Sequence, residues 1–125
     1  MGASNGTTET NIYPNNGGTF YPRIQATNSG VSGLSLNTDA YFIASRINAT
    51  EVNGYRNTTK YTVANPTVSL NSLRTYYLGA NNDGTIRYNA NQTAFATIGD
   101  GLSDTEVANL YTAVQKYQTS LNRNV

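Results

Sequence analysis

Apolar residues recur at helical spacing near the C-terminal end of the chain. The repeating positions are Val107, Leu110, Tyr111, Val114, Tyr117 and Leu121, which together give one apolar stripe on a helix. Ser103 and Glu106 have the spacing of a capping box, and Leu102 and Val107 that of a hydrophobic staple. The pattern predicts one amphipathic helix over residues 103–121, with structural roles for Ser103, Glu106, Leu110 and Val114.

Upstream of this helix, the apolar positions fall in short runs rich in Tyr, Thr, Ile, Val or Phe, which favour strands. The runs are 19–26, 40–47, 51–56, 59–64, 75–80, 85–89 and 93–98. Turn signals separate them, and Asn81-Asn82-Asp83-Gly84 predicts a tight hairpin because an Asp-Gly pair tolerates positive φ. The regular spacing predicts a mainly β fold: an antiparallel, jelly-roll-like β-sandwich, complete or partial, with one C-terminal amphipathic helix.

The length of 125 residues predicts a single domain. Residues 1–18 are rich in Asn, Gly and Thr and are expected to form an extended N-terminal arm, followed by the sandwich domain over 19–125. Pro22 cannot donate a hydrogen bond to a neighbouring strand, so the run 19–26 is expected at a sheet edge. The run 75–80 is apolar on both faces and is expected at the centre of a sheet.

The composition narrows the classes of partner. The chain contains 18 Asn and 18 Thr, 12% of its residues are charged, and its net charge is +1. The six Arg are scattered, so we expect no nucleic-acid partner, which would need clustered positive charge. No apolar run is long enough for a membrane-spanning helix, so no membrane insertion is expected. A low net charge lowers the solubility of isolated copies and therefore favours an assembly.

Few residues in this chain could carry catalytic chemistry. The sequence has no His and no Cys, which excludes a Ser-His-Asp triad and zinc sites of the usual nitrogen and sulfur kind. A glycosidase needs two carboxylates that face each other, and no predicted strand carries such a pair. Asp104 and Glu106 lie close together, but capping of the helix accounts for both. We therefore expect a non-enzymatic protein that needs no cofactor.

Calcium is the one cofactor for which the sequence offers candidate ligands. Asp39, Asn82 and Asp83 carry carboxylate or amide oxygens of the kind that Ca²⁺ binds. Their simpler interpretation is as turn and loop residues that bond to nearby backbone.

The ten tyrosines are the remaining candidates for recognition. A tyrosine offers a flat apolar face and a polar tip, which suits both sugar binding and interface packing. Five of them border predicted loops and are candidates for a glycan site or an interface: Tyr13, Tyr21, Tyr41, Tyr55 and Tyr61. Three others, Tyr77, Tyr88 and Tyr111, are expected in the core. The residues alone leave glycan binding and packing open.

Several segments taken together resemble the second half of a laminin-G-like, concanavalin A-like lectin/glucanase sandwich. They are Ala40-Tyr41-Phe42-Ile43-Ala44-Ser45-Arg46, Tyr55-Arg56-Asn57, Tyr76-Tyr77-Leu78-Gly79-Ala80, Phe95-Ala96-Thr97-Ile98-Gly99-Asp100-Gly101-Leu102-Ser103, and Glu106 through Tyr111. The ending from Gln115 to Val125 resembles the C-terminus of such modules in bacteriophage structural proteins. The resemblance covers residues 19–125 and is strongest over 95–125. Thr58 stands where the family has Gly.

The resemblance implies a virion surface component, such as a head or tail fibre or a decoration module. It implies a virion-surface or extracellular location, with further copies of the chain, a trimer in particular, or other virion proteins as partners. A carbohydrate-binding module for bacterial surface glycans is the alternative, and a glucanase-type glycoside hydrolase is less favoured. Family members usually have more chain, so this module is expected to be a piece of a longer protein or to be completed by a neighbouring copy. No calcium or sugar ligand transfers residue by residue.

Overall fold

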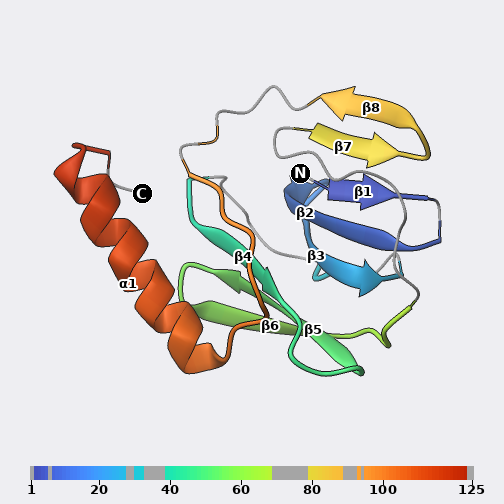
Figure 1. The fold of residues 1–125 in the computed structure, drawn as a ribbon, viewed down its shortest axis with the longest axis horizontal. Coiled ribbons are helices and arrows are strands. Elements are labelled where there is room, and N and C mark those ends of the chain that lie inside the picture. The colour runs from blue at the N-terminus through green and yellow to red at the C-terminus, as the bar shows by residue number, and fades with distance from the viewer. Residues whose placement is uncertain are drawn as a thin grey trace.

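The computed structural model describes residues 2–5, 7–27, 30–32, 39–68, 79–88, 93 and 95–123. Within them the chain forms strands and one helix (Figure 1). The strands are β1 (Gly2–Ser4), β2 (Glu9–Asn16), β3 (Thr19–Ala26), β4 (Phe42–Ser45), β5 (Glu51–Arg56), β6 (Thr59–Ala64), β7 (Gly79–Asn82) and β8 (Thr85–Tyr88), and the helix is α1 (Asp104–Ser120). The prediction of a mainly β fold with one C-terminal helix is confirmed.

The larger sheet has five strands in the order β3-β2-β1-β7-β8. Its neighbouring strands are antiparallel except for β1 and β7, which are parallel. As Pro22 predicted, β3 lies at an edge. The expected N-terminal arm over 1–18 is wrong, because these residues supply β1 and β2. Pairing with strands on both sides outweighs the low strand propensity of this polar sequence.

Tight turns with positive φ connect the hairpins of this sheet. Gly17 and Gly18, with φ of 61° and 80°, join β2 to β3. Asp83 and Gly84, with φ of 49° and 82°, join β7 to β8, as the predicted hairpin requires. The run 75–80 is found as β7 from residue 79 onward, and residues 75–78 lie outside the described part of the chain.

The smaller sheet is antiparallel, in the order β4-β5-β6, and β3 packs against its β4 and β5 strands. Phe20 is fully buried between the sheets, with its ring centroid 5.2 Å from that of Phe42 and 6.3 Å from that of Tyr61. Gly54 makes the close approach possible, because a Cβ atom there would lie 2.6 Å from Phe20 and from Pro22.

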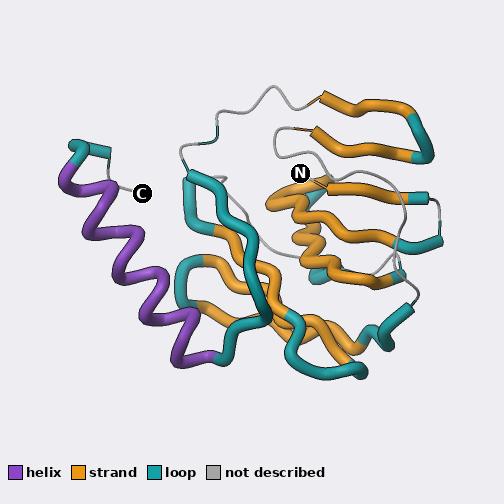
Figure 2. The backbone as a smooth tube through the Cα atoms, viewed as in Figure 1, coloured by secondary structure: helices purple, strands orange, loops and turns teal. Residues whose placement is uncertain are grey.

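The other face of the smaller sheet carries the helix. Successive side chains of a strand point to opposite faces, so Gly54 faces the larger sheet while Tyr55 faces α1. Tyr55 forms a buried cluster with Ile43 and Val107, and Tyr41, Leu102 and Leu110 pack against it. The molecule therefore has three layers, a five-stranded sheet, a three-stranded sheet and a helix (Figure 2).

The helix matches the predicted range 103–121 closely, with Ser103 as its N-cap. Val107 and Val114 are buried, and Leu110 and Tyr111 are half-buried. The last part of the predicted stripe does not face the core. Tyr117 is 50% exposed and Leu121 is 41% exposed, while Gln118 is buried instead. In Figure 1 the C-terminal half of α1 leads away from β5 and β6, which contact its first turns. No helix in the described residues is long and apolar enough to cross a membrane.

The predicted strand over 93–98 is wrong in its described part. Residues 95–99 form no strand. Phe95 makes ring contacts instead, with its centroid 6.1 Å from that of Tyr41 and 6.1 Å from that of Tyr117. From Phe95 beside Tyr117 to Leu102 beside the Val107 cluster, this segment runs antiparallel to α1.

Candidate functional site

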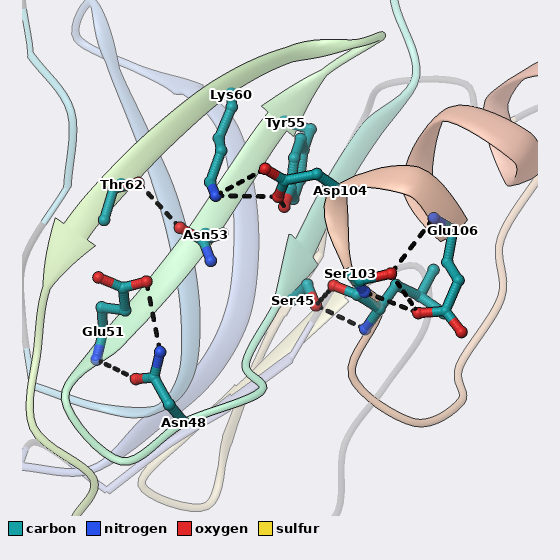
Figure 3. Close-up of polar contacts among 11 residues, drawn as sticks. Ser45, Asn48, Glu51, Asn53, Tyr55, Lys60, Thr62, Ser103, Asp104 and Glu106 are labelled. Carbon is teal, nitrogen blue, oxygen red and sulfur yellow. Dashed lines mark hydrogen bonds and ion pairs between the residues drawn. The ribbon is translucent and has the colours of Figure 1, made fainter.

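The start of α1 meets the open face of the smaller sheet at a group of polar side chains (Figure 3). Ser103 and Glu106 form a capping box there. The Ser103 N–H donates to Glu106 Oε2 at 2.8 Å, and the Glu106 N–H donates to Ser103 Oγ at 3.4 Å. Hydrogen bonds from the Ser103 hydroxyl and backbone lower the pKa of Glu106. This carboxylate is therefore an ionised structural acceptor.

Asp104, the first residue of the helix, binds the sheet directly. Its Oδ1 accepts a hydrogen bond of 2.7 Å from the Tyr55 hydroxyl, and the Lys60 ammonium lies 2.9 Å from Oδ1 and 3.0 Å from Oδ2. Hydrogen bonds from Lys60 and Tyr55 lower the pKa of Asp104 below its ordinary value of 3.8. Burial and the bond to Asp104 raise the pKa of Tyr55, so the phenol stays protonated. The three groups form a lock between helix and sheet.

A row of further polar side chains continues along β5 and β6 away from this lock (Figure 3). The Thr62 hydroxyl donates to Asn53 Oδ1 at 2.9 Å, and Asn48 Nδ2 donates to Glu51 at 3.3 Å. Lys60 and Thr62 are exposed, whereas Asn53 is buried. The row offers both donors and acceptors to solvent, a surface suited to hydrogen-bonded recognition rather than to proton transfer.

A second polar cluster lies on the larger sheet, across β2 and β3. Arg23 forms an ion pair with Glu9, which also accepts hydrogen bonds from Asn11 Nδ2 at 3.0 Å and from the Ser4 hydroxyl at 3.3 Å. The Arg23 guanidinium also lies 3.9 Å from the centre of the Tyr21 ring. The sequence pattern does not predict this cluster, because residues 1–18 resemble an arm without strand partners. The opposite charges of Glu9 and Arg23 were the available signal.

Arg46 is another residue that the sequence analysis left without a role. Its Nε donates to the Ile24 carbonyl at 2.7 Å, and its Nη2 donates to the Asn65 carbonyl at 2.9 Å. It therefore binds backbone from β3 and from the segment after β6 at the same time. Burial lowers the pKa of Arg46, but its hydrogen bonds are those of a structural clamp.

The five candidate tyrosines lie in different environments. Tyr55 is buried in the helix–sheet core and Tyr61 packs against Phe20 between the sheets. Tyr13 and Tyr21 are direct partners across β2 and β3, both half-buried. Tyr41 is half-buried beside Phe95, and its hydroxyl lies 3.4 Å from that of Thr97. The structure therefore does not gather the five into one site.

The candidate calcium ligands take the positions of loop and turn residues. Asp83 lies in the β7–β8 turn, and its N–H donates to the Ser4 carbonyl at 2.6 Å. The backbone of Asn82 pairs with Thr85 and Ser4. Asp39 is exposed ahead of β4. Among the described residues, no three His, Cys, Asp or Glu side chains come together as a metal site would need.

Three aromatic rings form a row from the start of β4 to the second half of α1, in the order Tyr41, Phe95 and Tyr117. Tyr117, at the outer end of this row, is 50% exposed. Leu121, four residues after Tyr117, is 41% exposed, and Ile98, three residues after Phe95, is 67% exposed. Three of the four exposed large apolar residues found in the described part of the chain therefore belong to α1 and the segment before it.

Comparisons of the chain with family models, with curated proteins and with solved structures found no match. The resemblance to a laminin-G-like, concanavalin A-like module therefore stays a prediction from the sequence.

Proposed function

We propose that this chain is a non-enzymatic structural module of a virion or other extracellular surface, which acts by assembling with further copies or with other surface proteins. The observation that carries the proposal is the exposed apolar surface of α1 and the segment before it, with Ile98, Tyr117 and Leu121 open to solvent. Exposed apolar patches on small proteins mark interaction sites. The virion context comes only from the resemblance of residues 115–125 to the C-terminus of modules in bacteriophage structural proteins.

The placement of the carboxylates supports a role without catalysis. Asp104 is held by Tyr55 and Lys60, and Glu106 is held by Ser103. Glu9 is in an ion pair with Arg23, at the second polar cluster. Groups whose charges are already matched by structural partners are poor general acids and bases, which need a pKa near the working pH.

The test is the oligomeric state of the purified chain, measured by sedimentation velocity and light scattering over a wide range of concentration. We expect reversible self-association at high concentration, or a stable oligomer. A strict monomer that also fails to bind any co-purified surface protein of the same particle would contradict the proposal.

Carbohydrate binding is the second candidate function, and the polar row of Figure 3 favours it. Lys60 and Thr62 are exposed and, with Asp104, present ammonium, hydroxyl and carboxylate groups at one face of the sheet, where the buried Asn53 amide holds the Thr62 hydroxyl. Such groups bind sugar hydroxyls. A glycan array probed with the chain, with and without Ca²⁺, tests the idea, and Thr62→Val is the matched variant. No bound glycan in either condition would contradict it.

A further inference from the structure

The open apolar surface can be defined as a strip of four residues, Phe95, Ile98, Tyr117 and Leu121. Phe95 contacts Tyr117 directly, with ring centroids 6.1 Å apart. Leu121 lies one helical turn beyond Tyr117, so the two share a side of the helix. Ile98 lies on the antiparallel segment, between the contact at Phe95 and the contact at Leu102. The strip thus spans the second half of α1 and the segment beside it.

The charges around this apolar strip are separated by sign. The charged residues from 95 to 123 divide along the helix: Asp100, Asp104 and Glu106 lie just before or within its first turn, and Lys116 and Arg123 lie in its second half and just beyond it. The charge of Asp104 is offset by Lys60, while Asp100, Lys116 and Arg123 are exposed. One end is therefore acidic and the other basic, and the helix dipole places its positive pole at the acidic end.

A surface with one acidic end, an apolar middle and one basic end is complementary to itself after a two-fold rotation. We propose that the partner of the apolar strip is a second copy of this chain, packed antiparallel so that the acidic end of each copy faces the basic end of the other. The two helices would then cross in opposite directions, and Ile98 of one copy would face the Tyr117–Leu121 end of the other. Isologous contacts of this kind are the commonest in homo-oligomers.

Charge complementarity is the reason to choose a second copy over another partner. A parallel arrangement would bring Asp100 and Glu106 against their own equivalents, and Lys116 and Arg123 against theirs, which like charges disfavour. The net charge of +1 gives two copies little long-range repulsion. The inference rests on the proposed assembly function and makes it specific: a two-fold pair through α1, and not the trimer that the family resemblance favours.

Two charge-reversal variants test the arrangement. The first is Asp100→Lys, which makes the acidic end of the strip more positive, and the second is Lys116→Glu with Arg123→Glu, which makes its basic end negative. Each variant alone should dimerise roughly tenfold more weakly than the wild type, because the attraction between the acidic end of one copy and the basic end of the other is lost at both of the symmetric contacts. An equimolar mixture of the two should recover a heterodimer, since opposite charges again face each other.

Sedimentation equilibrium of each variant and of the mixture gives the readout. Circular dichroism and thermal melting check that each variant is folded, which its exposed positions favour, and Tyr117→Ser tests the apolar part of the contact separately. Recovery in the mixture supports the two-fold pair. Self-association that none of these variants changes, or a trimer, overturns the pair but leaves the assembly function standing. A monomer at every concentration overturns the pair, and it contradicts the assembly function as well if the chain also binds no other surface protein of the particle.

Discussion

Gln118 is a polar residue at a buried position of α1. It is 1% exposed, and its Oε1 has no hydrogen-bond partner among the described residues. A buried amide oxygen without a partner loses its water without compensation, a penalty of about 1–3 kcal/mol. The apolar pattern predicts this inward position for Tyr117 and Leu121, because apolarity alone does not reveal the direction in which the helix leaves the sheet.

Replacing this amide tests the cost directly. We expect Gln118→Leu to raise the free energy of unfolding by about 1 kcal/mol, since it removes the unpartnered group and keeps most of the volume. Urea denaturation measures the change. Gln118→Glu, which keeps the size but buries a charge, should have the opposite sign. A loss of stability in Gln118→Leu similar to that in Gln118→Glu would show that the amide is bonded.

Asp104 makes the lock between helix and sheet sensitive to acid. Its pKa is lowered by Lys60 and Tyr55, so its stabilising effect is fully present above the unfolded-state pKa and is lost as the pH falls through the lower folded-state value. We expect wild type to be more stable than Asp104→Asn at pH 7, and the difference to be smaller at about pH 3, below the ordinary carboxyl pKa of 3.8. Urea midpoints at both pH values measure it. A difference that is the same at both would mean that the carboxylate charge plays no part.

At the scale of elements, local sequence signals were sufficient where an element carries its own turn or cap. The predicted bounds of β3, β5, β6 and the helix agree with the structure because turn residues or the Ser103 cap flank them. β1 and β2 were missed because their sequence is polar and depends on pairing with distant strands. The capping box could be predicted because Ser103 and Glu106 are three positions apart. Tyr55 and Asp104 are 49 positions apart, so no local sequence pattern predicts their contact.

The helix offers a matched pair of substitutions on its apolar stripe. Leu110 packs against the Ile43–Tyr55–Val107 cluster, whereas Leu121 is 41% exposed at the far end. Leu110→Ala should lower the free energy of unfolding by about 2 kcal/mol, near the low end for buried leucines because the side chain is only half-buried. Leu121→Ala should change it by less than about 0.5 kcal/mol. Chemical denaturation of both variants distinguishes them, and equal losses would mean that the helix is covered along its whole length.

At the scale of the whole molecule, stacking of three layers depends on close contact between the two sheets. Gly54 lies where β5 meets β3, and a Cβ atom there would clash with Phe20 and Pro22. Sequence alone could not find this role, because Gly54 sits in a run that reads as an ordinary strand. The clamp by Arg46 could not be found from sequence either, because only the fold brings together its acceptors on β3 and after β6.

A methyl group added at this contact should separate the layers. We expect Gly54→Ala to lower the free energy of unfolding by about 1–3 kcal/mol through overpacking. Gly99→Ala is the control, because no atom lies within 4 Å of a Cβ atom there, and it should be neutral or slightly stabilising. Thermal melts of both variants provide the comparison. A neutral Gly54→Ala would mean that the sheets can move apart without loss.

The parallel pairing of β1 with β7 has a consequence for the order of folding. β1 lies between β2 and β7 in the sheet, and β7 comes more than seventy residues after it along the chain. During synthesis β1 can pair at once with β2, but its other edge remains unpaired until residues 79–82 have left the ribosome. Contacts between such distant segments form slowly, and an open strand edge invites pairing with other chains. Of the described strands, β1 is made before the others and is among the last to be enclosed on both sides, so aggregation during folding should begin at its open edge.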